Sequence, residues 1–299
     1  MNILVTGANG FLGQHLVKYL SAPEYNVTAT SRGVCRIPQG IPHNYFSIEL
    51  TDAEAVTNLG TAVNPQVIIH TAAISKPDEC EKNKDFCLQN NVEATRHLLQ
   101  AFDSITEPGK LFIYLSTDFV FGENGPHKED DGKEPLNFYG ESKLMAEELV
   151  IKSGLPYAIV RPVFIYGPVW QGLRHSFLHW VKNNLEQGKQ IKVVSDQLRT
   201  PTYVNDICTG IECIIKQRNT GIYHLAGKDV LSPYEMAITT AEVLGLDGAL
   251  IESVTSETFP EPVLRAKRSG LKIDKAQREL GYEPVSFAEG VEYSFGKVD

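Results

Sequence analysis

The chain has 299 residues, of which 42% are hydrophobic and 22% charged, so it can fill one large α/β unit or two smaller domains. Its formal net charge of −9 argues against a nucleic-acid partner, because phosphate binding needs concentrated Lys and Arg. No segment approaches the ~18 consecutive apolar residues of a membrane helix, and the N-terminal residues lack the pattern of a secretion signal, so we expect a cytoplasmic protein without a membrane partner.

Short apolar runs alternate with helical patterns through the first half of the chain. The runs predict strands at 2–6, 26–30, 67–70, 111–116 and 157–161. The stretches between them predict helices near 11–21, 52–62, 82–103 and 138–153. This alternation is typical of parallel βαβ units, in which helices cover the sheet and ligands bind at the carboxyl ends of the strands.

The pattern changes after residue 161. An amphipathic stretch at 173–187 precedes a strand-like run at 191–195, and a helix at 205–217 with a strand at 222–225 again suits a covered sheet. From residue 227 onward we expect mainly helices, near 232–245, 274–280 and 287–296. We therefore predict a nucleotide-binding lobe that is interrupted and followed by a smaller second lobe.

The five cysteines form an odd set without a C-x-x-C pair: Cys35, Cys80, Cys87, Cys208 and Cys213. This pattern supports neither a zinc site nor a disulfide framework. We therefore expect reduced thiols and no metal.

A glycine-rich segment, GANGFLG, joins the first strand to the first helix. Gly7 permits a tight turn, Gly10 lets backbone N–H groups approach a pyrophosphate, and Gly13 lets the helix pack closely on the strand. The spacing differs from G-x-G-x-x-G, and a glycine-rich turn also occurs in α/β folds without a nucleotide. Because strand, loop and helix are contiguous, we predict a dinucleotide held by Gly7, Asn9, Gly10, Phe11, Leu12 and Gly13.

The residues after the second strand indicate which dinucleotide is preferred. A carboxylate there would bind a ribose diol, whereas this chain has Ser31 and Arg32, and a guanidinium suits a 2′-phosphate. We therefore favour NADPH, with NADH as the alternative if Arg32 is only a solvated charge. Glu49 could bind the adenine or cap a helix. Further cofactor lining is expected from Leu50, Thr71, Ala72 and Ala73.

Tyr139 and Lys143 are four residues apart at the start of a predicted helix, so their Cβ atoms should lie about 5–6 Å apart on one face. An ammonium about 4 Å from the phenolate would stabilise it by on the order of 4 kcal/mol, or roughly three pKa units. That would make Tyr139 an effective acid near pH 7. A chance Y-x-x-x-K on an amphipathic helix is the alternative.

Seven motifs occur in the order found in extended short-chain dehydrogenases/reductases: GANGFLG, residues 70–73, STDFVFG at 116–122, YGESK at 139–143, RPVFIYG at 161–167, PTYVND at 201–206 and YHLAG at 223–227. More narrowly, the chain resembles the dTDP-4-dehydrorhamnose reductase family almost from end to end. The most specific pieces are S-T-D-x-V-F, N-x-Y-G-x-x-K and D-Q-x-x-x-P-T.

The resemblance implies an α/β fold, with a Rossmann-like, doubly wound parallel sheet and a smaller, mostly helical substrate lobe. On this basis we assign residues 1–161 plus 205–226 to the NAD(P)-binding domain and 162–204 plus 227–299 to a sugar-nucleotide-binding lobe. Dimers are common in the superfamily, so analogy favours a homodimer.

The resemblance also implies NAD(P)H-dependent reduction of a 4-keto-6-deoxy sugar nucleotide. Thr117 would hydrogen-bond the substrate carbonyl, Tyr139 would donate a proton to it, and Lys143 would complete the catalytic set. Arg161 is expected near the nicotinamide and its ribose. The residues expected at the substrate are Thr117, Asp118, Phe119, Phe164 and Arg199, although Asp118 could instead cap neighbouring N–H groups. Ser116 is expected to be structural and bonded within its turn.

Two other functions remain open. A sugar-nucleotide 4-epimerase uses the same three catalytic groups, but it retains NAD and typically has an acidic residue at the ribose. A non-catalytic regulatory subunit resembling the methionine adenosyltransferase β subunit can keep both the Tyr and the Lys. Water elimination is disfavoured, because Phe119 stands where the related dehydratases have a glutamate.

Overall fold

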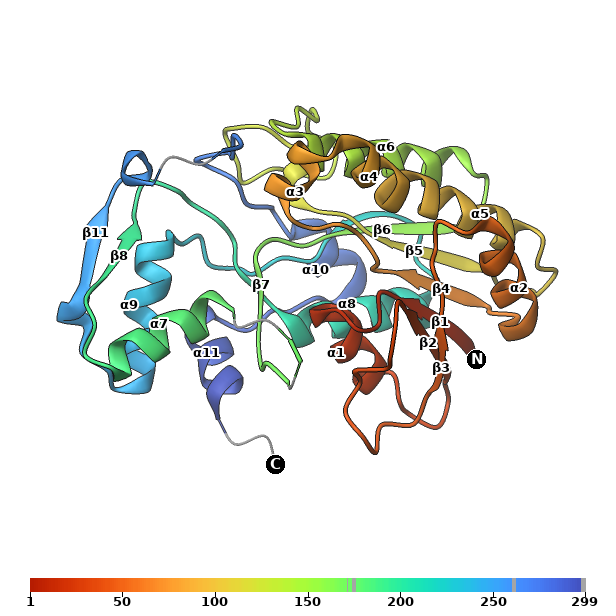
Figure 1. Cartoon of the computed structure of the whole chain (residues 1–299), viewed down its shortest axis with the longest axis horizontal. Coiled ribbons are helices and arrows are strands. Elements are labelled where there is room, and N and C mark those ends of the chain that lie inside the picture. Colours follow the sequence, from red (N-terminus) through yellow and green to blue (C-terminus); the bar gives the residue numbers. More distant parts are fainter. Residues whose placement is uncertain (171, 174–175, 260–261, 297–299) are drawn as a thin grey trace.

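The computed structural model describes residues 1–170, 172–173, 176–259 and 262–296 (Figure 1). The strands are β1 (Asn2–Thr6), β2 (Asn26–Ser31), β3 (Asn44–Ser47), β4 (Val67–His70), β5 (Leu111–Leu115), β6 (Tyr157–Arg161), β7 (Ile165–Tyr166), β8 (Ile191–Val194), β9 (Thr202–Tyr203), β10 (Gly221–His224) and β11 (Ile251–Val254). The α-helices are α1 (Phe11–Tyr19), α2 (Ala53–Val63), α3 (Pro77–Lys82), α4 (Lys84–Leu88), α5 (Ala94–Asp103), α6 (Phe138–Lys152), α7 (Phe177–Glu186), α8 (Val204–Gln217), α9 (Pro233–Leu244), α10 (Asp274–Leu280) and α11 (Phe287–Phe295). Within the described ranges, none of the helices combines the length and apolarity needed to cross a membrane.

The central sheet has seven strands in the order β10-β6-β5-β4-β1-β2-β3. All of its neighbouring strands are parallel. The chain order reverses between β1 and β4, and such a reversal opens a crevice for ligands at the carboxyl ends of the strands. The predicted doubly wound parallel sheet is therefore confirmed, although β3 was not predicted as a strand.

Alternate residues of each strand serve the two faces of the sheet, because successive side chains point in opposite directions. In β1, Ile3 and Val5 join a core with residues of α1, α8 and α10. Leu4 belongs to the opposite core, with residues of α2, α5 and α6. Figure 1 shows the resulting three layers, with α2, α5 and α6 on the upper right side of the sheet and α1 and α8 on its lower left side.

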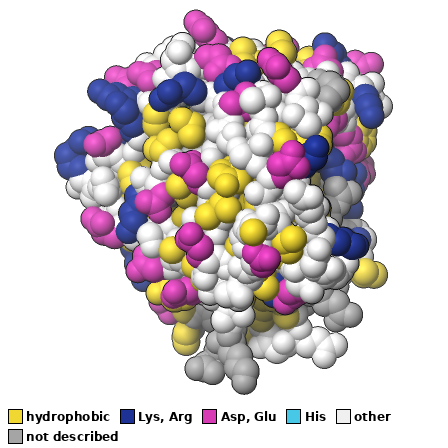
Figure 2. All heavy atoms as spheres, turned by 90° about the vertical axis from the view of Figure 1, so that its left-hand side faces the viewer, with side chains coloured by type: hydrophobic (Ala, Val, Ile, Leu, Met, Phe, Trp, Pro, Cys, Tyr) yellow, Lys and Arg dark blue, Asp and Glu magenta, His cyan; other side chains and the backbone are white. Residues whose placement is uncertain are grey.

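A smaller unit lies beside the sheet and contains β8, β11, α7 and α9 (Figure 1). Its own core joins Val181 of α7, Ala237 of α9 and Ile251 of β11. Figure 2 shows this end of the molecule, where acidic, basic and hydrophobic side chains are interspersed. β11 was not predicted, and residues 174–175 of the helix expected at 173–187 lie outside the described residues. The domain boundaries proposed from the sequence stay a prediction.

The single helix expected at 82–103 is divided into α4, one turn of π-helix (η1, Gln89–Glu93) and α5. Asn83 starts α4, because its Oδ1 accepts a hydrogen bond from the N–H of Phe86 at 3.0 Å. Within η1, Asn91 Oδ1 accepts from the N–H of Ile74 at 2.7 Å, and its Nδ2 donates to Ser142 Oγ at 2.9 Å. The π-turn therefore ties the loop after β4 to helix α6.

Candidate active site

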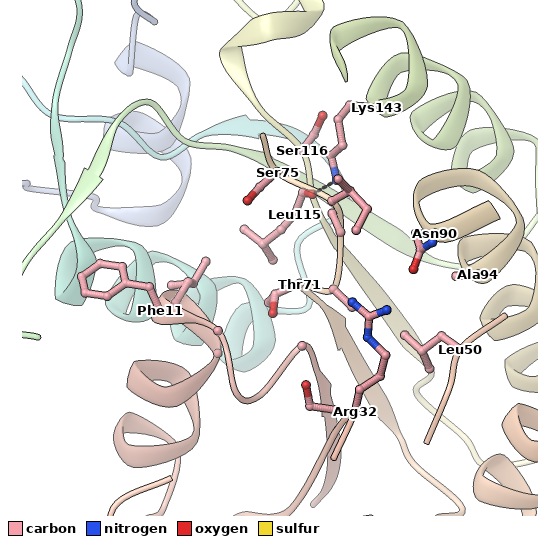
Figure 3. Close-up of a pocket in the computed structure, with 18 of the residues that line it drawn as sticks. Phe11, Arg32, Leu50, Thr71, Ser75, Asn90, Ala94, Leu115, Ser116 and Lys143 are labelled. Carbon is pink, nitrogen blue, oxygen red and sulfur yellow. Dashed lines mark hydrogen bonds between the residues drawn. The ribbon is translucent and has the colours of Figure 1, made fainter. Parts of the chain in front are cut away.

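A groove of about 480 Å³ lies over the carboxyl ends of β1, β2, β4 and β5, at the reversal of strand order (Figure 3). All predicted cofactor residues except Asn9 and Arg161 line it: Gly7, Gly10, Phe11, Leu12, Gly13, Ser31, Arg32, Glu49, Leu50, Thr71, Ala72, Ala73, Tyr139 and Lys143. The structure therefore brings together segments from the first 143 residues of the chain. That these residues bind a dinucleotide stays a prediction.

The glycines of the first loop are required by close backbone approaches. Gly7 has a φ of +68°, and a Cβ there would lie 2.6 Å from the backbone N of Ala72. A Cβ at Gly13 would collide with the carbonyl oxygen of Gly7. Helix α1 starts after Gly10, which has no side chain to cap the first turn, so the N–H groups there are free to bind an anion.

A weak ion pair borders the groove next to the glycine loop. Arg32 Nη1 lies 3.7 Å from Glu49 Oε2, and both side chains are about half exposed. Such exposed pairs contribute little to stability, so Arg32 can exchange its carboxylate partner for a ligand phosphate.

Asn9 does not line the groove, contrary to the prediction. Its Nδ2 donates to the carbonyl oxygens of Arg32 at 3.2 Å and Val34 at 2.9 Å. Its Oδ1 accepts from the N–H of Arg36 at 2.8 Å. The side chain therefore holds the loop after β2, because all of its polar groups are used there.

Thr117, Tyr139 and Lys143 meet at the end of β5. Asn137 caps α6 by accepting a hydrogen bond from the N–H of Gly140 at 3.1 Å, which places Tyr139 and Lys143 on the first turns. The hydroxyl of Thr117 donates to Asp118 Oδ1 at 3.2 Å and lies near enough to the phenol of Tyr139 to influence its pKa. Lys143 Nζ donates to the carbonyl oxygen of Leu115 at 2.6 Å. All three predicted catalytic side chains are buried.

Burial sets the protonation of Tyr139 and Lys143. It raises the pKa of Tyr139 above its usual value, an effect that the nearby hydroxyl of Thr117 opposes and the charge of Asp118 reinforces. Burial lowers the pKa of Lys143 to about 7, against the influence of Glu147. The expectation that Lys143 would acidify Tyr139 is therefore wrong for this structure. The phenol stays protonated at neutral pH, which is the form that can donate a proton.

Arg161 lies outside the groove, contrary to the prediction from the resemblance. Its guanidinium is fully buried between β6 and α6 and bonds both carboxylate oxygens of Glu147, at 2.8 Å and 2.6 Å. It also donates to the carbonyl oxygen of Glu129 at 3.3 Å. A bidentate pair of this kind leaves Arg161 no reach toward a cofactor.

Three of the predicted substrate residues line a second, much smaller cavity of about 10 Å³: Asp118, Phe119 and Arg199. The ring of Phe119 meets that of Tyr139 edge to face, with centroids 5.4 Å apart. Asp118 Oδ1 accepts a hydrogen bond from Thr117 Oγ1 at 3.2 Å, and burial raises the pKa of the Asp118 carboxyl against the opposing charge of Arg199. This cavity therefore adjoins the catalytic residues.

Phe164 is not brought to either cavity. Its ring packs against that of Phe177, with centroids 5.9 Å apart. Its φ of +40° turns the chain between β6 and β7. The structure therefore gives Phe164 a role in packing α7 rather than a contact in the site.

The groove also contains residues that the sequence did not identify: Ile48, Ile74, Ser75, Asn90, Ala94, Leu115, Ser116, Pro162 and Ile165. Ser116 was expected to be bonded within its turn, but its Oγ has no hydrogen-bond partner among the described residues. Its position next to Thr117 was a usable signal. No signal in the sequence indicated Asn90 and Ala94, because their position in the groove depends on how η1 and α5 pack on the sheet.

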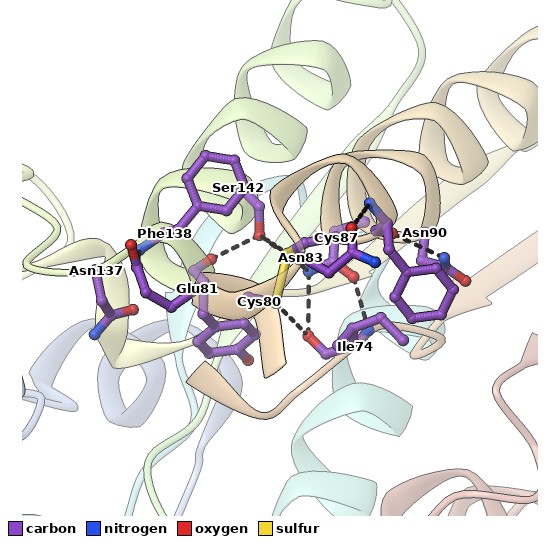
Figure 4. The surroundings of a disulfide bond; sticks show 12 residues. Ile74, Cys80, Glu81, Asn83, Cys87, Asn90, Asn137, Phe138 and Ser142 are labelled. Carbon is purple, nitrogen blue, oxygen red and sulfur yellow. Dashed lines mark hydrogen bonds between the residues drawn. A yellow bond between two sulfur atoms is a disulfide. The ribbon is translucent and has the colours of Figure 1, made fainter. Parts of the chain in front are cut away.

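Cys80 of α3 and Cys87 of α4 form a disulfide, so the expectation of reduced thiols is wrong for this pair (Figure 4). Their Cα atoms are 5.0 Å apart because the chain breaks at Asn83 and folds back between two short helices. The bond lies beside Ser142, whose Oγ donates to the carbonyl oxygen of Tyr139 at 2.8 Å. The remaining cysteines, Cys35, Cys208 and Cys213, are free thiols.

The chain is similar to known proteins along nearly its whole length. The sequence matches the family described as the RmlD substrate binding domain over residues 1–299. The spore coat polysaccharide biosynthesis protein SpsK of Bacillus subtilis is 31% identical over 297 residues, which cover 97% of this chain and 95% of SpsK. The methionine adenosyltransferase 2 subunit beta of Bos taurus is 30% identical over 273 residues, which cover 89% and 78% of the two chains. A crystal structure of dTDP-4-dehydrorhamnose reductase from Bacillus anthracis in complex with NADP is 28% identical, with a TM-score of 0.85 over 98% of both chains.

Proposed function

The chain belongs to the RmlD substrate binding domain family, and from that premise we propose that it reduces a 4-keto-6-deoxy sugar nucleotide with NADPH. The observation that carries the proposal is that Thr117, Tyr139 and Lys143 meet at the end of a groove that begins at the glycine loop. The similar reductase from Bacillus anthracis was solved with NADP, which supports a nicotinamide cofactor.

The dinucleotide, when bound, supplies a hydride to the carbonyl carbon of the sugar. The phenol of Tyr139 donates its proton to the carbonyl oxygen, and the pKa raised by burial keeps that proton in place until it is needed. The hydroxyl of Thr117 stabilises the negative charge that develops on the same oxygen. Because Thr117, Tyr139 and Lys143 are all buried, water is largely excluded from the step.

The proposal is tested with a panel of keto-sugar nucleotides and the absorbance of NADPH. We expect oxidation of NADPH with a 4-keto-6-deoxy sugar nucleotide. Tyr139→Phe should lower turnover about 10²–10⁴-fold, the usual contribution of a general acid, and leave the Kd of NADPH unchanged. Tyr19→Phe is the matched control, because that hydroxyl bonds Thr209 on the surface and Tyr19 does not line the groove. Turnover by Tyr139→Phe at the wild-type rate would remove the proposed acid.

A second function is favoured by the 30% identity to the methionine adenosyltransferase 2 subunit beta. A regulatory subunit would co-purify with a catalytic partner and leave every keto-sugar nucleotide unreduced. Oxidation of NADPH by the isolated chain would exclude a purely regulatory role. Retention of stoichiometric NAD through purification, without consumption of NADPH, would instead indicate a 4-epimerase.

A further inference from the structure

Ser116 is the first residue after β5 and has a buried side chain that the protein itself does not satisfy. The residue is 6% exposed, and its Oγ has no hydrogen-bond partner among the described residues. Two other polar side chains of the groove are bound within the chain: Thr71 Oγ1 donates to the carbonyl oxygen of Thr6 at 2.6 Å, and Asn90 Nδ2 to that of Phe86 at 2.9 Å. The hydroxyl of Ser116 therefore differs from its neighbours.

A buried hydroxyl without a partner destabilises a folded protein, because it gives up its bonds to water and gains nothing. Buried polar groups are therefore bonded almost always, and an exception needs an explanation. Ser116 lines the groove (Figure 3), and rotation about its Cα–Cβ bond among the staggered positions can turn Oγ toward it. A ligand in the groove can therefore supply the missing bond.

The neighbours of Ser116 indicate which part of a ligand it meets. The carbonyl of the preceding residue, Leu115, accepts a hydrogen bond from Lys143 Nζ at 2.6 Å, and Tyr139 and Lys143 line the groove together with Ser116. The glycine loop and Arg32, which suit phosphate groups, line other parts of the groove. Ser116 thus lies where the catalytic residues are, and the group that reacts there is the nicotinamide.

We propose that Ser116 Oγ binds the nicotinamide-ribose half of the dinucleotide and so fixes it against Tyr139 and Lys143. This inference rests on the proposed function. The nicotinamide-ribose half carries ribose hydroxyls and a carboxamide, and a serine hydroxyl can donate one hydrogen bond and accept two. Ser116 makes no hydrogen bond to the adenosine half in this arrangement.

Isothermal titration calorimetry with NADPH and with 2′,5′-ADP, which lacks the nicotinamide half, tests the assignment. Ser116→Ala should raise the Kd of NADPH roughly 3- to 10-fold, the effect of one neutral hydrogen bond, and leave the Kd of 2′,5′-ADP unchanged. The Tm of the ligand-free variant should equal or exceed that of the wild type, because no bond within the protein is lost.

Ser232→Ala is the matched control. Ser232 is also buried, but its Oγ caps α9 by accepting from the N–H of Glu235 at 3.1 Å, so its loss should lower the Tm and leave both Kd values unchanged. An unchanged Kd of NADPH in Ser116→Ala would overturn the inference, as would equal weakening of both probes or a fall in Tm like that of Ser232→Ala. Failure of the wild type to bind either probe would overturn the proposed function as well.

Discussion

Tyr139 and Lys143 share one face of α6, yet burial raises the pKa of Tyr139 and lowers the pKa of Lys143. Removal from water disfavours the charged form of each group, so the phenol keeps its proton and the ammonium tends to lose one. In the proposed ketone reduction, Tyr139 therefore carries its proton at neutral pH without help from Lys143. The contribution of Lys143 is better sought in binding, where a ligand hydroxyl or anion next to Nζ would favour its charged form.

The lowered pKa of Lys143 predicts a pH dependence of stability. Its folded pKa of about 7 lies below the ordinary value of 10.5, so between these values the folded chain binds fewer protons than the unfolded chain. The contribution of Lys143 to the free energy of unfolding should therefore rise with pH across this window and be least favourable below it.

Urea unfolding of the ligand-free protein at several pH values checks this prediction. The difference in unfolding free energy between the wild type and Lys143→Met should grow as the pH rises from about 7 toward 10.5. Lys152→Met is the control, because Lys152 is on the same helix but largely exposed, and its difference should be flat. A flat difference for Lys143→Met would mean that the ammonium is not desolvated.

Arg32 should determine the preference between the two nicotinamide cofactors. Its guanidinium is held only by the exposed pair with Glu49, so Arg32→Ala costs the fold little and removes a charged donor for a 2′-phosphate. We expect the Kd of NADPH to rise about 10-fold or more and that of NADH to change little. Glu49→Gln should not raise the Kd of NADPH. Equal losses for both cofactors would show that Arg32 supports the loop instead.

At the level of elements, the position of Tyr139 depends on how closely α6 approaches the turn after Thr117. A Cβ at Gly140 would collide with the carbonyl oxygen of Phe119, so the first turn of the helix rests directly on that backbone. Asn137 fixes the same turn through its cap. The distance between the hydroxyls of Thr117 and Tyr139 is therefore set by backbone contact rather than by side-chain packing.

Gly140→Ala should consequently separate the two catalytic hydroxyls. We expect a loss of about 1–3 kcal/mol of stability from overpacking and a fall in turnover, with the Kd of 2′,5′-ADP unchanged. Gly60→Ala in α2 is the control, because its Cβ would meet Ala101 Cβ at an ordinary 3.5 Å, and alanine favours the helix by about 1 kcal/mol. Full turnover by Gly140→Ala at unchanged stability would contradict this account.

The elements that the sequence predicted are those with strong local signals. β1, β4, β5 and β6 are continuous apolar runs with buried residues, and the glycine loop and the Tyr139–Lys143 pair are contiguous motifs. The split of the helix at 82–103, the disulfide and the ion pair of Arg161 depend on contacts between segments distant in the chain or on a local break. Periodicity carries no information about such contacts, so these features needed the structure.

At the scale of the whole molecule, residues 263–269 connect the edge of the catalytic site to the smaller unit. Asn137 Nδ2 donates to the carbonyl oxygen of Leu264 at 2.8 Å. The carboxylate of Glu123 accepts from the N–H groups of Lys267 at 2.9 Å and Arg268 at 3.1 Å. Lys267 also pairs with Asp196 at 3.3 Å. Arg265, Ala266 and Ser269 of the same segment line the cavity beside Asp118, whose volume of about 10 Å³ is far less than a sugar needs.

On the proposed function, an arrangement too closed to hold the sugar competes with substrate binding. The apparent affinity therefore decreases as the fraction of open molecules decreases. Glu123→Ala removes the acceptor for two backbone donors of residues 263–269 and should raise that fraction. We expect faster hydrogen exchange at the amides of Lys267 and Arg268, a lower KM for the sugar nucleotide and an unchanged Kd of NADPH. Glu283→Ala, at an exposed position outside both cavities, should change none of these quantities. A higher KM in Glu123→Ala would show that residues 263–269 hold the substrate in place, and that the closed form favours binding rather than opposing it.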